Sequence, residues 1–469
     1  MAGFFMPEKR TIAVNGNELK EALGAAGVGA LIPKIIDPQL LEYQRRYSPL
    51  VRSIPSGRWD SDVYYFNRRT RNPRGGHVQD GGARPLTAST YEQYAFQMTH
   101  LQTVGGVTGY AQAVTRQVIG DLRAREIEGS IQGLYWDMET SVLWGNAAAT
   151  VNGAYPQFDG LDSLVGNFSG AEQNAQDKGG ASLSLAHLDE LADMVETNAA
   201  MSVFDSQWMF VMSNTAQSRM SQLLQAQQRF EGPIEVAAGL IVPSYRGIPI
   251  VKSSFLSTRT YTMGTVTQAS ASTGGTLAAG TYNYRISAVM ERQGEIAASA
   301  AVTTAALTGA TNTVTLSFAV PGGLEGAQPL LYKVYRSTSP GTETLLGVVD
   351  AVVGFAADGK TPIMATSIVD NGATLIPKAG ATAPAQPSPV YVGGNVNRFP
   401  PATGNESIYL VSRDRENLYR PYVRELEPLD VFPTTDSPDT LPYAIVADTT
   451  LALRAPKYLG VINRVNTQL

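Results

Sequence analysis

The chain has 469 residues, a formal net charge of -5 and no cysteine. The length predicts two or three domains, and the lack of cysteine excludes disulfides, thiolate metal sites and cysteine nucleophiles. The acidic balance argues against a dedicated nucleic-acid reader. No stretch approaches the roughly 18–20 apolar residues of a membrane span, and the first ten residues lack a signal-peptide core. We therefore expect a cytoplasmic chain with no membrane partner.

Residues 1–50 predict an N-terminal arm. Pro33, Pro38 and Pro49 prevent a long helix there and leave an extended chain with a short helix at residues 40–46. Arms of this kind usually lie on another subunit, so we expect this one to contact a second copy of the chain.

Residues 51–100 predict an extended β-hairpin. Aromatic and β-branched residues flank two glycine pairs, an arrangement typical of a mobile turn. The hairpin cannot bury its arginines in a core of its own, so we expect it to rest against a partner. The six arginines expected to face that partner are Arg58, Arg68, Arg69, Arg71, Arg74 and Arg84. The alternative is a basic loop that contacts only solvent.

Residues 111–144 predict one long amphipathic helix, since apolar residues recur every three to five positions. It contains three internal glycines, Gly120, Gly129 and Gly133, each of which costs roughly 0.5–1 kcal/mol relative to alanine. A long helix that tolerates them is either bent there or closely approached by another backbone. The alternative is an ordinary core helix with some loose turns.

The next region intermixes helices and strands, which indicates an α/β or α+β domain. The expected helices are 185–198 and 215–227, and the expected strands are 208–212, 240–242 and 248–252.

From about residue 260 the chain is rich in Thr, Ala, Gly and Ser. TYNYRISAV, NTVTLSFAV, PLLYKVYRS and ETLLGVVD alternate at period two between turn residues, a pattern typical of a β-sandwich. APAQPSPV predicts an exit linker, and a helical and mixed pattern resumes with SIYLVSRDRENLYRPYVRELEPLDVF. The sandwich is therefore expected to be an insertion, and the final strand is expected to close the host sheet.

No catalytic constellation is visible. His77, His100 and His187 lie far apart in unlike contexts, and the chain has no dinucleotide fingerprint, phosphate loop, nucleophile elbow or metalloprotease helix. We expect no cofactor, no metal and no enzymatic activity, which leaves binding, scaffolding or assembly as the function.

The order of these elements resembles that of the major capsid proteins of tailed bacteriophages, with the Hong Kong 97-type fold. PQFDGLDSLV is similar to the phrase that follows the family's spine helix. WMFVMSNTAQSRMSQLL with LIVPSYRGIPIVKSSFL is similar to its axial domain, and LALRAPKYLGVINRV resembles its closing strand. The resemblance covers most of residues 30–258 and 405–469.

The resemblance implies an α+β fold with an inserted all-β sandwich of the immunoglobulin or fibronectin type. The expected parts are an N-terminal arm (1–50), an extended loop (51–100), a peripheral domain with the spine helix (101–155), an axial domain (156–259), the inserted sandwich (260–403) and a return to the peripheral and axial domains (404–469).

The function so implied is self-assembly into hexamers and pentamers of an icosahedral shell, with the spine helix yielding at its glycines during expansion. The shell would enclose double-stranded DNA, bound non-specifically, in a virion assembled in the host bacterial cytoplasm. A separate scaffolding protein and a portal are expected partners, and decoration proteins are possible ones. No lysine occurs between Lys34 and Lys178, so we expect no isopeptide crosslink from the hairpin.

Two alternatives stay open: an encapsulin-like bacterial shell, and an adhesion or carbohydrate-binding module carried by the sandwich. An enzyme is the weakest alternative.

Overall fold

The computed structural model describes most of the chain from Pro49 onward. The described residues are 49–84, 86–116, 120–147, 156–166, 174–204, 207–226, 232–237, 240–256, 261–323, 326–358, 361–378, 388–389, 400–431 and 439–468. The expected helix at 40–46, and all but the end of the expected arm, lie outside these ranges. No described helix is long and apolar enough to cross a membrane.

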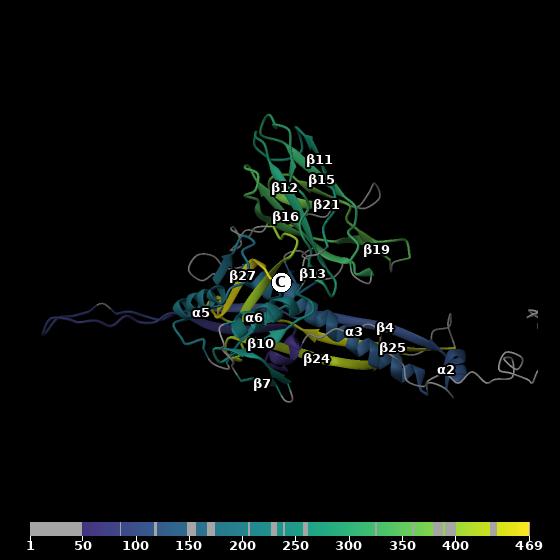
Figure 1. Cartoon of the computed structure of the whole chain (residues 1–469), viewed down its shortest axis with the longest axis horizontal. Helices are drawn as coiled ribbons and strands as arrows, with labels where there is room; N and C mark the ends of the chain where they lie inside the picture. The colour runs from purple at the N-terminus through teal and green to yellow at the C-terminus, as the bar shows by residue number, and fades with distance from the viewer. Residues whose placement is uncertain are drawn as a thin grey trace, which may run out of the picture.

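The described part consists of an elongated body of two sheets with helices, and a pair of antiparallel sheets that stands on it (Figure 1). The first body sheet has the order β1-β24-β25-β4, with β26 beside β24. Its strands are β1 (Ser56–Arg58), β4 (Thr99–Thr108), β24 (Leu418–Asp430), β25 (Thr440–Thr449) and β26 (Ala452–Leu453). Strands from both halves of the chain therefore build one sheet.

The predicted helix at 111–144 is wrong as a single element. The chain instead forms α2 (Gly109–Thr115) and α3 (Leu122–Trp144). Asp121 caps the start of α3 by accepting a hydrogen bond from the Ala124 amide at 3.2 Å, and Gly120 has a φ of +84°. A capping carboxylate after a left-handed glycine starts a new helix. The apolar period continues across this break, so periodicity alone did not reveal it.

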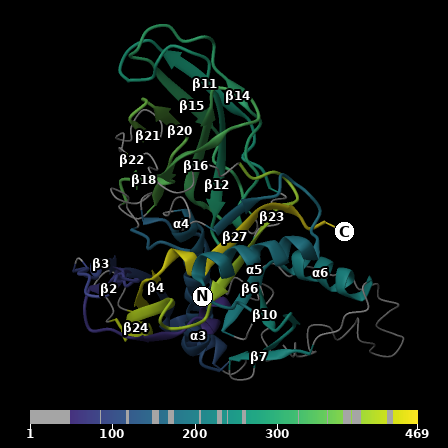
Figure 2. The same cartoon turned by 90° about the vertical axis from the view of Figure 1, so that its left-hand side faces the viewer.

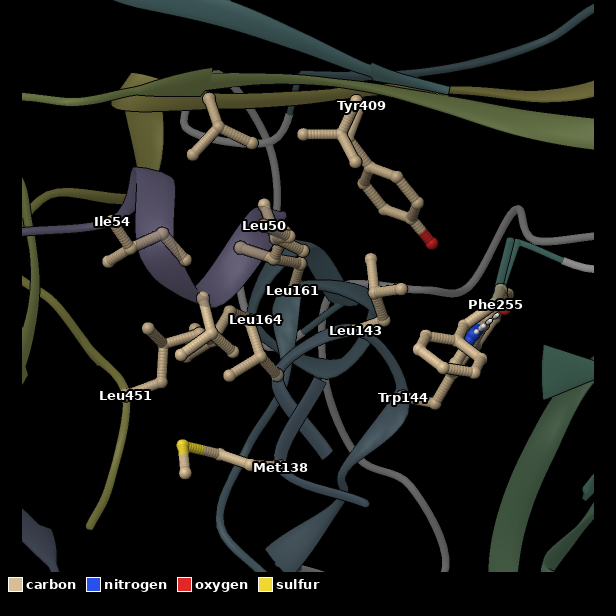
Figure 3. Close-up of a cluster of buried hydrophobic side chains, with 14 of the residues drawn as sticks. Leu50, Ile54, Met138, Leu143, Trp144, Leu161, Leu164, Phe255, Tyr409 and Leu451 are labelled. Carbon is tan, nitrogen blue, oxygen red and sulfur yellow. Dashed lines mark hydrogen bonds between the residues drawn. The ribbon is translucent and has the colours of Figure 1, made fainter. Parts of the chain in front are cut away.

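α3 lies along the first sheet and forms the centre of the main core. Tyr443 of β25 donates a hydrogen bond to the Glu126 carbonyl of α3 at 3.2 Å. Met138, Leu143 and Leu161 pack with Leu50 in this core (Figure 3), where α1 (Leu50–Ser53) and α4 (Leu161–Gly166) also contribute.

The second body sheet has the order β5-β27-β23-β6-β10-β9. Its strands are β5 (Asn174–Asp177), β6 (Trp208–Met212), β9 (Ser244–Tyr245), β10 (Ile248–Lys252), β23 (Asn405–Ser412) and β27 (Leu459–Asn466). Phe210 of β6 packs in the core beneath α5 (Leu185–Ala199) and α6 (Asn214–Ala226), while its neighbour Val211 packs in the main core. The sheet is thus buried on both faces.

Most elements expected between residues 185 and 252 are confirmed. The strands 208–212, 240–242 (β8) and 248–252 have the predicted bounds. The helix α5 ends one residue later than predicted, and α6 begins and ends one residue earlier than predicted. A further short strand, β7 (Ile234–Ala237), pairs with β8.

The helical pattern expected after residue 404 is wrong, because β23 and β24 are strands. All eight residues of β23 are buried, and a strand buried on both faces shows no alternation. The last strand, β27, does belong to the body sheet, but it lies between β5 and β23 instead of at an edge. The 3-10 turn Pro456–Tyr458 precedes it.

The upper pair of sheets contains all four segments predicted to alternate (Figure 2). One sheet has the order β11-β15-β20-β21-β22, and the other has β13-β12-β16-β17 with β14 beside β12. The strands are β11 (Val266–Ala271), β12 (Asn283–Met290), β13 (Gly294–Glu295), β14 (Val302–Thr303), β15 (Thr313–Phe318), β16 (Pro329–Ser337), β17 (Thr344–Asp350), β20 (Ser367–Asp370), β21 (Thr374–Lys378) and β22 (Ser388–Pro389), with a separate hairpin of β18 (Val352–Phe355) and β19 (Pro362–Met364). The sheets share a core that includes Tyr284, Tyr332, Leu316 and Ile368.

Candidate assembly surface

The predicted hairpin is formed by β2 (Val63–Arg71) and β3 (Thr90–Gln97), which pair antiparallel and project from the body (Figure 1). Phe66 stacks on Tyr94 at 5.6 Å and on Phe96 at 6.0 Å between ring centroids. At its base, Tyr64 is buried against Trp59 and Tyr419 of the body. One face of the hairpin is therefore an aromatic ladder that fixes its direction relative to the body.

Three of the six predicted contact arginines have partners within the chain. Arg58 lies 3.0 Å from Asp60, although both side chains are highly exposed. Arg68 donates to the Tyr94 hydroxyl at 2.6 Å and lies 3.6 Å from Glu92. The guanidinium of Arg69 lies 5.5 Å from the ring centre of Tyr91.

The other three, Arg71, Arg74 and Arg84, lie toward the tip of the hairpin and are exposed. The guanidinium of Arg84 covers Gly76, where an added Cβ would lie 2.2 Å from it. These three cations are therefore the ones best placed to meet another chain.

Exposed apolar side chains accompany the basic ones on the hairpin. They are Tyr65, Val78, Leu86 and Tyr91. Val104 is exposed on β4, and Tyr110 and Val114 are exposed on α2, the helix at the opposite end of the body from the hairpin (Figure 1). Large apolar side chains exposed in groups mark surfaces for protein contact.

The three glycines predicted to flex lie in unlike places. Gly120 precedes α3 in a left-handed conformation, and Gly129 lies inside α3 with open space where a Cβ would be. A Cβ on Gly133 would lie 3.3 Å from the guanidinium of Arg292, a residue of the upper sheets. Only Gly129 is therefore both within the helix and free of close neighbours.

Arg292 links the upper sheets to α3. Its guanidinium holds Asp137 with two hydrogen bonds of 2.7 and 3.0 Å and donates to the Gly133 carbonyl at 3.3 Å. Gly294 follows with a φ of +92°, and a Cβ there would lie 2.6 Å from Trp144. The turn that carries Arg292 therefore rests directly on the C-terminal half of α3.

A buried ion cluster forms the second link. The Lys333 ammonium of β16 lies 2.5 Å from Asp162 of α4 and 3.1 Å from Glu295 of β13. Asp162 also accepts a hydrogen bond from Tyr409 at 3.0 Å, and Glu295 accepts one from Tyr335 at 2.7 Å. The Lys333–Asp162 ion pair therefore joins the upper sheets to α4, and Tyr409 connects Asp162 to the second body sheet, while Glu295 holds Lys333 from within the upper sheet.

Neither link was predicted from the sequence, although β16 offered a signal. PLLYKVYRS places a single lysine within an apolar strand, and Leu331 and Lys333 share the face of β16 that turns toward the body. A lone cation in an apolar strand needs a buried carboxylate.

The histidines do not come together. His77 is exposed, the Nδ1 atom of His100 lies 2.7 Å from Asp448, and burial lowers the pKa of His187 in α5. In the part of the chain that the structure describes, no group of three or more His, Cys, Asp or Glu residues could hold a metal ion.

Comparison with protein families gives one match. Residues 92–311, just under half of the chain, match the family model described as SU10 major capsid protein. This stretch runs from β3 through α3 and the body into the upper sheets. This match gives the chain the function of a bacteriophage major capsid protein, which is the function predicted from the sequence. The encapsulin-like alternative is the weaker one. No curated protein matches the sequence significantly.

Several solved structures are distant likenesses of this chain. The SrpI encapsulin complex from Synechococcus elongatus PCC 7942 is 10% identical with a TM-score of 0.47, and 95% of this chain and 96% of that chain are covered. The capsid of the native GTA particle is 7% identical with a TM-score of 0.47, covering 95% and 99%. Gordonia phage Cozz is 10% identical with a TM-score of 0.45, covering 94% of each chain. Likenesses this low do not distinguish a phage capsid from a bacterial shell.

Proposed function

We propose that copies of this chain assemble into hexamers and pentamers that close into an icosahedral shell around double-stranded DNA. The observation that carries the proposal is the match of residues 92–311 to a major capsid protein family. The projecting hairpin supports it, because a closed ring needs a surface that reaches a different surface on the next copy.

In this proposal the chain has the Hong Kong 97-type fold. The β2–β3 hairpin is the extended loop, α3 is the spine helix, and the sheet covered by α5 and α6 is the axial domain. Residues 260–403 are an inserted immunoglobulin-like or fibronectin-like sandwich, whose two links to the body support a role as a fixed part of the subunit.

Hairpin arginines then pair with carboxylates of a neighbouring subunit. Arg71, Arg74 and Arg84 are the donors, and the exposed Glu126 and Glu128 of α3 are candidate acceptors. Asp137 and Glu139 of α3 are not candidates, because Arg292 holds the former and the latter is buried, accepting a hydrogen bond from the Val51 amide. Each exposed pair contributes only about 0–1 kcal/mol, but a shell repeats it in every subunit.

Shell expansion then bends the spine helix at its N-terminal half. Gly129 is the proposed flex point and Gly120 the hinge before the helix, whereas Arg292 holds the helix at Gly133. Replacing Gly129 with alanine slows expansion in this account, while the same change at Gly133 has a smaller effect on expansion.

The remaining partners follow from the same role. A separate scaffolding protein directs assembly, a portal admits the DNA, and decoration proteins would bind the outer surface. The DNA contacts the inner surface without sequence preference, through counterions and scattered cations.

Electron microscopy of the purified full chain, with and without a candidate scaffolding protein, tests the proposal. Closed particles or rings of five and six support it. Arg71→Ala, Arg74→Ala and Arg84→Ala together should reduce particle yield, whereas Arg58→Ala, whose cation is already paired with Asp60, serves as the matched control.

A further inference from the structure

A cavity of about 290 Å³ lies where the upper sheets meet the body. Its lining comes from both sides of this junction. His100 and Leu101 of β4 and Phe158 belong to the body, while Leu330, Asp350 and Met364 belong to the upper part. At about 30 Å³ per water molecule in the liquid, it has room for on the order of ten non-hydrogen atoms.

The wall of this cavity contains a carboxylate that the fold leaves partly unpaired. Asp350, at the end of β17, is only 4% exposed. Its Oδ1 atom accepts a hydrogen bond from the Val352 amide at 2.9 Å, while its Oδ2 atom is buried and accepts none from the residues that the structure describes. Such an atom needs a partner, because a buried carboxylate oxygen without one is costly.

The charges around Asp350 leave its own charge unmatched. Glu291 lines the same cavity nearer to solvent, and His100 is tied to Asp448 across 2.7 Å. Arg292, next to Glu291 in sequence, holds Asp137. The described residues that line the cavity include no lysine or arginine. Burial accordingly raises the pKa of Asp350 to about 7 and that of Glu291 above its usual value.

The other walls are largely apolar, with Leu101, Phe158, Leu330, Val352 and Met364 among them. Apolar walls are poor surroundings for a hydrated metal ion, which needs several oxygen ligands. They are good surroundings for methylene groups, which lose water when they enter the cavity.

We propose that this cavity binds an aliphatic cation, with its ammonium or guanidinium head on the Oδ2 atom of Asp350 and its methylene stem along the apolar walls. Glu291 at the mouth assists by attracting the cation. A free alkylamine and a basic side chain of a neighbouring chain share this chemistry.

Titration calorimetry of the full chain with n-butylammonium chloride tests the proposal. One butylammonium should bind per chain, at least about tenfold more tightly than n-butanol, its neutral counterpart. Asp350→Asn should weaken binding by about 30-fold or more, because the head loses a buried opposite charge. Leu330→Trp should also block binding by filling the cavity while leaving the carboxylate in place.

The pH dependence gives a second readout. The cation binds the ionised carboxylate, and a pKa of about 7 leaves roughly one tenth of Asp350 ionised at pH 6 and nine tenths at pH 8. Affinity should therefore rise about tenfold from pH 6 to pH 8, and this rise should be lost in Asp350→Asn.

The proposal is overturned by the absence of saturable binding, by equal binding to Asp350→Asn, or by tighter binding of MgCl₂ than of butylammonium. The same titration on assembled shells, which rests on the proposed function, separates the two sources. Loss of binding in the shell identifies the occupant as a basic side chain of a neighbour, and unchanged binding identifies a free amine. Binding to the unassembled chain stands or fails independently of shell formation.

Discussion

The buried ion cluster at the junction allows a quantitative test of how the upper sheets are attached. Lys333, Asp162 and Glu295 are each no more than 5% exposed, and the ammonium lies 2.5 and 3.1 Å from the two carboxylates. Lys333→Met keeps most of the side-chain volume but removes the only cation of the cluster. Breaking a buried pair in this way costs about 3–5 kcal/mol, because the remaining charges stay buried without compensation. We expect the free energy of unfolding to fall by that amount.

Urea unfolding followed by tryptophan fluorescence measures this change, since the Trp144 ring centre lies 5.6 Å from the Lys333 ammonium. The matched control combines Lys333→Met with Asp162→Asn and Glu295→Gln. The amides still accept the hydrogen bonds from Tyr409 and Tyr335 and no buried charge remains, so the triple variant should recover part of the lost stability, less the cost of the amide N–H groups that face the methionine introduced at position 333. A loss below about 1 kcal/mol in the single variant, or no recovery in the triple variant, would refute the electrostatic reasoning.

Three further predictions concern single regions of the chain. Gly129→Ala should raise the free energy of unfolding by about 0.5–1 kcal/mol in a urea titration, because a Cβ there meets nothing within 4 Å. Asp350→Asn should remove a fall in stability of up to about 1.4 kcal/mol per pH unit between pH 5 and 7. Replacing Arg71, Arg74 and Arg84 with alanine should leave the melting temperature of the unassembled chain unchanged, as measured by calorimetry.

The sign for Asp350 follows from its raised pKa. Between about pH 4 and the folded-state pKa of about 7, the folded chain holds a proton that the unfolded chain has released. Its contribution to stability is therefore present below about pH 4 and lost as the pH rises through 7. A stability profile of Asp350→Asn that runs parallel to that of the parent would contradict this sign. Destabilisation by Gly129→Ala would contradict the prediction for Gly129, and a lowered melting temperature of the triple arginine variant would contradict the prediction for the three arginines.

The sequence predicted best those elements whose local pattern matches their burial. The strands 208–212 and 248–252 and the helix beginning at residue 185 were predicted almost to the residue, because short apolar runs and one helical period were bounded by clear breaks. The prediction for residues 405–412 failed for the opposite reason, since burial on both faces of β23 removes the alternation of apolar and polar residues. The break at Gly120 was not predicted, because the apolar residues keep the same spacing on both sides of it. The helix nevertheless restarts there, where Asp121 caps α3.

The candidate site was only partly predictable. The hairpin and its arginines could be located from composition, but the sequence could not distinguish Arg68, which Tyr94 engages across the strand pair, from Arg71, which is exposed. The links through Arg292 and Lys333 join residues more than 150 positions apart, so no local pattern could reveal them. The single lysine in the otherwise apolar strand β16 indicated that a buried carboxylate lies near it, but not which one.

The central claim is that this chain builds a closed shell, and sedimentation velocity combined with negative-stain microscopy of the full chain tests it most directly. The account predicts closed particles, or rings of five and six copies, in the presence of a candidate scaffolding protein. A chain that stays monomeric both with and without that protein would contradict the account.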